Sequence, residues 1–184
     1  MRRQLKLHPD SHSLAVTRIE VEITRPRVDS LVLSYLVTGN MSAIRMPPAT
    51  EGGRSDGLWR HTCFEAFLHA SQGATYYELN FSPSRQWAAY RFSSYRQGMS
   101  MADEISALPV ETYSEPDRYT LQTSLNLDRF VSLSRDGVWR LALSALIEDT
   151  SGRMSYWALA HPSGKPDFHH ADCFVYEFSP AVAS

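Results

Sequence analysis

Residues 59–92 read WRHTCFEAFLHASQGATYYELNFSPSRQWAAYRF, and this stretch decides the fold class. Three segments within it, 61–68, 75–82 and 87–92, alternate in character and are rich in aromatic and β-branched residues, as half-buried strands are. The segments between them carry Gly, Ser, Pro and Gln, which favour turns. The pattern predicts an antiparallel meander of three strands joined by two hairpins.

The lengths of the two loops predict how the three strands pair. If residues 69–74 close symmetrically, Glu65 lies opposite Glu78, and if residues 83–86 form a four-residue loop, Glu78 lies opposite Arg91. One face is then apolar and predicted to be core, with Thr62, Phe64, Ala66, Tyr77, Leu79, Phe81, Ala88, Tyr90 and Phe92. The other face carries His61, Cys63, Glu65, Glu78, Asn80, Ser82, Trp87, Ala89 and Arg91. Any function is expected on this second face.

The polar row from Glu65 through Glu78 to Arg91 allows two interpretations. It is either a solvated row of ion pairs outside a sandwich, where each pair contributes about 0–1 kcal/mol, or a binding surface. Carboxylate, amide and guanidinium groups bind sugar hydroxyls, and an aromatic ring covers the apolar face of a sugar. With Asn80 in the row and Trp87 at its edge, the face has that composition. The sequence leaves both interpretations open.

The composition indicates a single soluble domain over residues 1–184. At 184 residues with 43% hydrophobic residues, the chain is long enough for one sizeable core. A net charge of −2 gives no basic field, so neither nucleic acid nor an anionic membrane is expected as a partner. Neither a run of about 18 apolar residues nor a secretory signal is found, which predicts a cytoplasmic location. Cys63 and Cys173 are then expected to be free thiols, although a disulfide between them, like the oligomeric state, is left open.

Alternating segments continue on both sides of the meander, at residues 14–24, 30–38, 111–127, 138–148, 154–160 and 173–178. Almost no helical periodicity interrupts them. About nine to eleven strands result, which predicts an all-β sandwich rather than an α/β fold.

A second polar cluster lies before the last strand, in the loop HPSGKPDFHH at residues 161–170. Its polar side chains are His161, Lys165, Asp167, His169 and His170. His and Asp can ligate zinc, but the spacing fits no strong metal motif, so a stiff binding rim or a structural loop is favoured over a metal site. Trp157 alternates with His161 on the strand that enters the loop, so the two are expected on one side. The tip of the loop could overhang the polar row.

Motifs of catalysis are absent from the sequence. No nucleophile elbow, phosphate-binding loop, dinucleotide fingerprint or paired CxxC occurs, so no catalytic residue is assigned and a binding protein is favoured over an enzyme. A weaker alternative makes Glu65 and Glu78 a general acid and base, because cross-strand neighbours about 5 Å apart approach the carboxylate spacing of retaining glycosidases. Arg91 in the same row would keep both ionised, which counts against it.

Three segments, DGLWRHTCFEAFL (56–68), YYELNFSPSRQWAAYRF (76–92) and SYWALAHPSGKPDFHH (155–170), resemble the bacterial DOMON-like proteins related to family 9 carbohydrate-binding modules. The resemblance covers about residues 16–178 and implies an immunoglobulin-like or jelly-roll β-sandwich whose relatives bind sugars or haem on one sheet. Glu65 matches an acidic strand residue of the family, and Glu78 with Asn80 matches the following strand. Haem-binding relatives use Met and His as axial ligands, for which the candidates here are Met99, Met101, His161 and His169.

The resulting prediction is a non-catalytic module that binds a sugar or a sugar-like polar small molecule on one sheet face, without a cofactor or a metal. A haem-binding domain is the first alternative, and a protein-interaction scaffold without a small ligand is the second. The predicted ligand-binding residues are His61, Glu65, Glu78, Asn80, Trp87, Arg91, Trp157, His161, Lys165, Asp167 and His169.

Overall fold

The computed structural model describes residues 1–180 and consists almost entirely of β-strands. The strands are β1 (Arg2–Leu7), β2 (Val16–Thr24), β3 (Ser30–Gly39), β4 (Gly53–Arg54), β5 (Cys63–Ala70), β6 (Tyr76–Phe81), β7 (Gln86–Phe92), β8 (Ser100–Met101), β9 (Val110–Ser114), β10 (Arg118–Asn126), β11 (Trp139–Glu148), β12 (Met154–Ala158) and β13 (Tyr176–Phe178). The short 3₁₀ helices are η1 (Met41–Ala43), η2 (Leu58–Arg60), η3 (Leu127–Arg129) and η4 (Ala171–Cys173).

The all-β class is confirmed. The number of strands exceeds the predicted nine to eleven, because short strands such as β4 and β8 form outside the alternating segments. Within residues 1–180, no helix is both long enough and apolar enough to cross a membrane.

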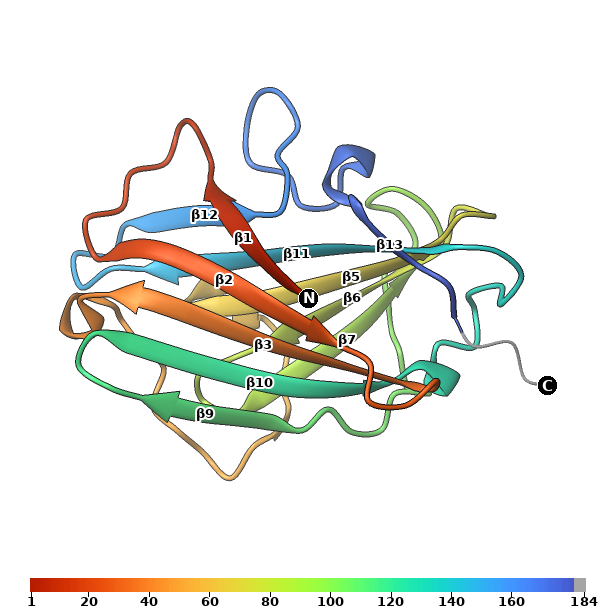
Figure 1. Cartoon of the computed structure of the whole chain (residues 1–184), viewed down its shortest axis with the longest axis horizontal. Coiled ribbons are helices and arrows are strands. Elements are labelled where there is room, and N and C mark those ends of the chain that lie inside the picture. Colours follow the sequence, from red (N-terminus) through yellow and green to blue (C-terminus); the bar gives the residue numbers. More distant parts are fainter. Residues whose placement is uncertain (181–184) are drawn as a thin grey trace.

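The strands form one curled sheet. Its order is β4-β7-β6-β5-β11-β12-β1-β2-β3-β10-β9, with β13 paired to β11 and β8 paired to β7. Neighbours along this path run antiparallel, apart from the parallel pair of β4 and β7. Residues 2–5 of β1 pair with β2, whereas Lys6 and Leu7 pair with β12. Strand β1 therefore connects the two halves of the curled sheet. Figure 1 shows β2, β3, β10 and β9 in front of β11, β5, β6 and β7.

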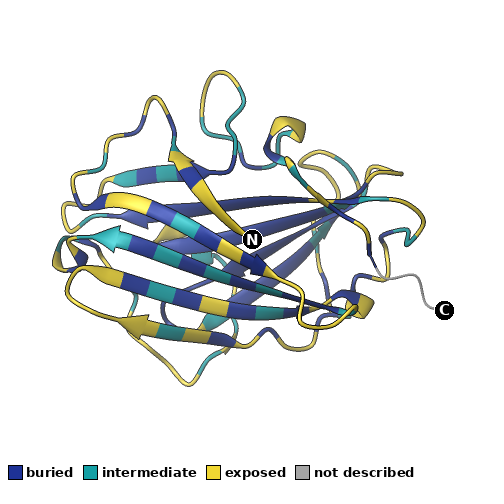
Figure 2. Cartoon of the chain, in the orientation of Figure 1, coloured by how far each residue is buried: buried dark blue, intermediate teal, exposed yellow. Residues whose placement is uncertain are grey.

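The main core fills the space between these two layers. Tyr35 and Trp139 are among its largest fully buried side chains, and the Tyr35 hydroxyl donates a 2.6 Å hydrogen bond to the carbonyl of Glu65 in the other layer. Strands β2 and β10 alternate between buried and more exposed residues, whereas β5 and β6 are buried on both faces (Figure 2). Other segments of the chain must therefore cover the outer face of β5 and β6.

The register within the meander differs from the prediction at both hairpins. Glu65 pairs with Asn80 and not with Glu78, a shift of two residues that leaves the side chains of β5 and β6 on their predicted faces. Glu78 pairs with Tyr90 and not with Arg91, and this shift of one residue turns β7 over. The prediction that Arg91 shares a face with the two glutamates is wrong.

The loop between β6 and β7 explains the second shift. Ser82 donates its backbone N–H to the carbonyl of Gln86 at 2.9 Å, so the loop has three residues instead of four. The last of the three, Arg85, has a left-handed backbone with φ of 70°, as is common in three-residue hairpin loops. As a result, Trp87 joins the main core and Tyr90 points to the outer face.

Candidate functional site

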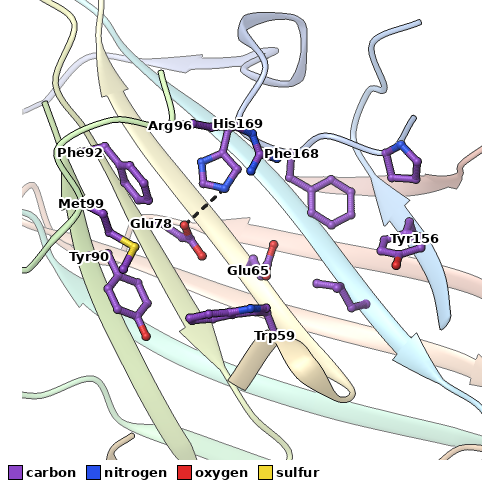
Figure 3. Close-up of a pocket in the computed structure, with 12 residues that line it drawn as sticks. Trp59, Glu65, Glu78, Tyr90, Phe92, Arg96, Met99, Tyr156, Phe168 and His169 are labelled. Carbon is purple, nitrogen blue, oxygen red and sulfur yellow. Dashed lines mark ion pairs between the residues drawn. The ribbon is translucent and has the colours of Figure 1, made fainter. Parts of the chain in front are cut away.

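Three segments from elsewhere in the chain cover the outer face of β5, β6 and β7. They are η2, the loop 93–99 after β7 and the segment 161–174 before β13. The cover and the sheet share a second apolar cluster, separate from the main core, and between them lies a cavity of about 430 Å³ (Figure 3). The cavity is lined by Trp59, Glu65, Glu78, Tyr90, Phe92, Arg96, Met99, Leu146, Tyr156, Pro166, Phe168 and His169.

Two glutamates on neighbouring strands form the floor of this cavity. Glu65 on β5 is 4% exposed and Glu78 on β6 is 7% exposed, so both carboxyl groups are largely removed from bulk water. Glu65 accepts a hydrogen bond from Ser144 Oγ at 3.1 Å, and Glu78 accepts one from Asn80 Nδ2 at 3.0 Å. Because Glu65 pairs with Asn80, the two carboxyl groups are diagonal neighbours rather than directly opposite.

Burial raises the pKa of both glutamates. The pKa of Glu78 rises to about 7, against the smaller lowering effects of Asn80 and Arg96. Burial also raises the pKa of Glu65 well above its ordinary value, and the negative charge of Glu78 raises it further. The pair therefore retains a proton more readily than exposed carboxyl groups do, and its charge state responds to a charged group placed next to it.

His169 approaches the carboxyl groups from the cover. The backbone N–H of Arg96 donates to the Tyr76 hydroxyl at 3.2 Å, and that hydroxyl lies 2.8 Å from His169 Nδ1. The other ring nitrogen, His169 Nε2, faces Glu78 Oε2 at 3.6 Å. Burial, followed by the charge of Arg96, lowers the pKa of His169 to about 4, so the ring is neutral at neutral pH.

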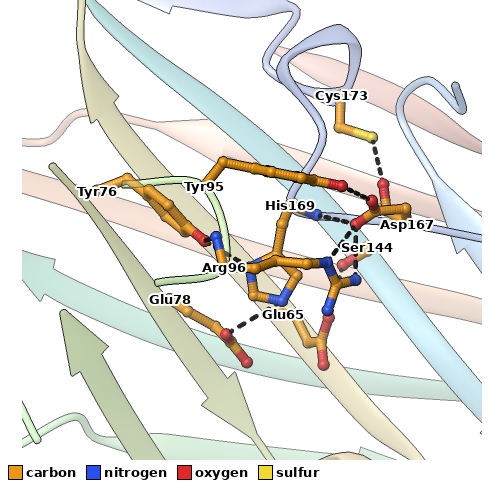
Figure 4. A network of polar contacts seen from close by, with 9 residues as sticks. All are labelled: Glu65, Tyr76, Glu78, Tyr95, Arg96, Ser144, Asp167, His169 and Cys173. Atoms are coloured by element: carbon orange, nitrogen blue, oxygen red, sulfur yellow. Dashed lines mark hydrogen bonds and ion pairs between the residues drawn. The ribbon is translucent and has the colours of Figure 1, made fainter. Parts of the chain in front are cut away.

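Arg96 ties the two covering loops together (Figure 4). Its guanidinium donates to Asp167 Oδ1 from Nη2 at 2.7 Å and from Nε at 3.2 Å. Tyr95 donates its hydroxyl to the same carboxylate, and the Cys173 thiol donates to the carbonyl of Asp167 at 3.3 Å. Cys63 and Cys173 are both buried free thiols, as expected. Arg96 itself has φ of 53°, an uncommon conformation for a residue other than glycine, which the bonds to Asp167 help to hold.

Aromatic rings form the walls of the cavity. Trp59 from η2 contacts Tyr90 of β7 edge to face, with ring centroids 5.7 Å apart. Phe92 stacks flat on Tyr76 with centroids 4.8 Å apart, and Figure 3 shows Phe168 on the other side of the glutamates. Such rings bury the apolar part of a ligand while polar groups at the floor bind its hydrogen-bonding part.

Comparison with known proteins relates this geometry to a known fold. No family model matches the chain, and no curated protein matches it. A candidate carbohydrate-binding protein from Bacteroides uniformis superposes with a TM-score of 0.71 over 95% of this chain and 84% of its own, at 13% identity. A family 9 carbohydrate-binding module from Caldicellulosiruptor kristjanssonii, in complex with glucose, superposes with a TM-score of 0.52 over 84% of this chain and 72% of its own, at 12% identity.

The chain shares their fold. The predicted relation to family 9 carbohydrate-binding modules is thus confirmed at the level of the fold, and the relation to DOMON domains stays a prediction. The likeness concerns the fold, so the residues of the candidate site follow from the geometry of this chain.

Three of the predicted site residues, Glu65, Glu78 and His169, line the cavity together. Asn80 is fully buried and bonded to Glu78, and Asp167 holds Arg96 from the side of the cover. The loop 161–170 lies over the polar face, as the sequence indicated.

Three other predicted site residues lie on the far side of the strands that carry them. Trp87 is 5% exposed and belongs to the main core. Arg91 turns away with β7, and its guanidinium lies 3.7 Å from Glu104. Trp157 is also part of the main core, because β12 directs Tyr156 toward the cavity instead. None of these three side chains lines the cavity, for Trp87 and Arg91 because of the shorter hairpin loop.

His61, His161 and Lys165 do not line the cavity either. His61 Nδ1 pairs with Glu148 Oε2 at 2.7 Å, beyond the end of η2. His161 Nε2 is bonded to the carbonyl of Lys6 at 2.8 Å and joins the last loop to β1. Lys165 lines a neighbouring groove on the outside of the cover. The two histidines are held by structural contacts between distant segments, which sequence periodicity does not reveal.

Sequence reasoning missed Arg96, Trp59 and Tyr90. Arg96 lies in a stretch without periodicity, and its partner Asp167 is 71 residues away. Trp59 lies in η2, directly after Gly57, which has φ of 73°. In the sequence, this glycine was the signal for a turn before the meander. In the predicted register Tyr90 faces the main core. In the structure the three-residue loop turns β7 over, and Tyr90 lines the cavity.

The cavity does not gather all of the proposed haem ligands, and no cluster of metal ligands forms in the part of the chain that the structure describes. Within residues 1–180, no three His, Cys, Asp or Glu side chains gather in a metal-binding arrangement. Of the proposed axial ligands, Met99 and His169 line the cavity, whereas Met101 and His161 do not. Both ring nitrogens of His169 already face polar partners, so an iron ligand would have to displace one of them.

Proposed function

We propose that this chain is a non-catalytic module that binds a sugar or a sugar-like polar small molecule in the cavity over β5, β6 and β7. The observation that carries the proposal is that two buried carboxyl groups, a guanidinium and an imidazole share one cavity with several aromatic rings. Carboxylate and guanidinium groups bind pairs of hydroxyls, and aromatic rings pack on the apolar face of a sugar. A volume of about 430 Å³ suits a small ligand.

The fold supports this proposal, because one similar structure is a family 9 module in complex with glucose. The classification of the curled sheet as an immunoglobulin-like or jelly-roll sandwich stays a prediction. A cavity over the polar face also favours a small ligand over a protein-interaction scaffold, which would use a flat surface. The cytoplasmic location stays a prediction.

A glycosidase is the alternative function that the geometry of the site supports. Two carboxyl groups with raised pKa values face the same cavity, and catalysis would need one to stay protonated as the acid while the other ionises as the base. Their diagonal placement sets the two residues about 7–8 Å apart, farther than a directly opposed pair. Turnover of a glycoside that disappears in Glu65→Gln would overturn the non-catalytic proposal.

Trp59→Ala is expected to weaken sugar binding at least about tenfold, because it removes the ring that packs against the ligand. Isothermal titration calorimetry against a panel of mono- and disaccharides measures this. Tyr113→Ala is the matched control, since Tyr113 is a 65% exposed aromatic residue on β9 and does not line the cavity. The proposal fails if no sugar binds, or if the two variants bind sugar as well as each other.

A further inference from the structure

When both glutamates are ionised, the floor of the cavity has more hydrogen-bond acceptors than donors. Glu65 and Glu78 each present two carboxyl oxygens to the cavity, whereas Asn80 lies beside them and does not line it. Asn80 is fully buried, and among the described residues its Oδ1 has no hydrogen-bond partner. Among the described residues, the donors bonded to the two carboxyl groups are the Ser144 hydroxyl and the Asn80 amide. A buried acceptor without a donor is costly, so a ligand rich in donors would complete this site.

Positive charge is scarce at the same place. Arg96 offsets part of the charge of the glutamates, but its guanidinium is bonded through two nitrogens to Asp167. His169 contributes no charge at neutral pH, because burial lowers its pKa to about 4. The single charge of Arg96 is therefore shared between Asp167 and the two buried glutamates, and buried carboxylates favour a further partner of opposite charge.

An ammonium group meets both requirements. It carries a positive charge and three donors but no acceptor, so it adds nothing to the excess at the floor. The walls suit it as well, because Trp59 and Tyr90 line the cavity next to the glutamates, and cations are attracted to the faces of such rings. A hydroxyl of a neutral sugar, in contrast, brings one acceptor oxygen with each donor.

We propose that the ligand is an amino sugar, with its ammonium group between Glu65 and Glu78 and its ring against Trp59. This proposal names the ligand class of the same cavity and rests on the proposed function. N-acetylation removes both the charge and the ammonium donors, so an acetylated amino sugar should bind no better than the neutral sugar.

The test compares D-glucosamine, D-glucose and N-acetyl-D-glucosamine by titration calorimetry with the whole chain in a neutral buffer. Glucosamine is expected to bind at least about tenfold more tightly than glucose, the effect of one charge-assisted hydrogen-bonding group. In Glu78→Gln and Glu65→Gln the ratio of the glucosamine and glucose affinities should shrink to within about threefold, whatever the change in the affinity for glucose itself. Glu111→Gln, an exposed glutamate on β9, should leave the preference unchanged.

The outcomes separate this proposal from the proposed function. If glucose binds and glucosamine binds no more tightly, the amino-sugar proposal is overturned and sugar binding stands. If the preference exists but persists in both glutamine variants, the ammonium group does not sit between these glutamates, and the proposal is again overturned. If no sugar of the three or of the wider panel binds, both proposals fail.

Discussion

Gly39→Ala is expected to lower the free energy of unfolding by about 3 kcal/mol or more. Gly39 ends β3 with φ of 155° and pairs with Val16 of β2. A Cβ atom there would lie 2.1 Å from the carbonyl oxygen of Ala15, which already accepts a 2.8 Å hydrogen bond from the backbone N–H of Asn40. Backbone atoms cannot move aside as the end of a flexible side chain can, so the β2–β3 pairing would have to open at this end.

Gly152→Ala separates this close approach from the cost of a positive φ. Gly152 has φ of 82° in the turn between β11 and β12, and a Cβ atom there meets nothing within 4 Å. Its substitution should cost only about 1 kcal/mol. Urea unfolding followed by tryptophan fluorescence measures both variants. Equal losses would show that the contact with Ala15 is not the cause.

The faces of β5 and β6 could be predicted from sequence because side chains alternate with a period of two. The register of the first hairpin differs from the predicted one by two residues, which changes the partners but not the faces. Glu65 and Glu78 consequently share a face in either register. The two carboxyl groups at the floor of the cavity were therefore within reach of sequence reasoning.

The orientation of β7 could not be predicted in the same way. The strand places Trp87 on one face and Tyr90 on the other, so aromatic residues do not decide which face is inside. The length of the loop decides it, and the left-handed residue that closes the loop is Arg85 rather than a glycine. Without that signal, a four-residue loop was an equally good assumption, and the error moved Arg91 to the wrong face.

The cover of the cavity depends on contacts between distant segments. The bonds between Arg96 and Asp167 join two irregular loops 71 residues apart in sequence. Irregular loops carry no periodicity from which such a contact could be inferred. A guanidinium group thus lines the cavity, but it belongs to Arg96 and not to the predicted Arg91.

Glu78→Gln is expected to raise the free energy of unfolding by about 2–3 kcal/mol at pH 8 and to change it little at pH 4. Burial raises the pKa of Glu78 to about 7 in the folded chain, whereas an unfolded glutamate titrates near 4.3. Between these values the folded state holds a proton that the unfolded state has released. The stability contributed by this group is therefore fully present below the unfolded pKa and is lost as the pH rises through about 7. Glutamine stays neutral throughout and can still accept the Asn80 hydrogen bond.

Glu111→Gln on the exposed side of β9 is the matched control and should stay within about 0.5 kcal/mol of the parent chain at both pH values. Urea unfolding of the three proteins at each pH gives the differences, in which the other titrating groups cancel. A Glu78→Gln variant no more stable at pH 8 would mean that this carboxyl group is well solvated, which would remove the reason to expect a cation in the ligand. A variant that is more stable and yet no longer prefers glucosamine would show that the buried charge serves binding at the expense of stability, as charged groups at functional sites commonly do.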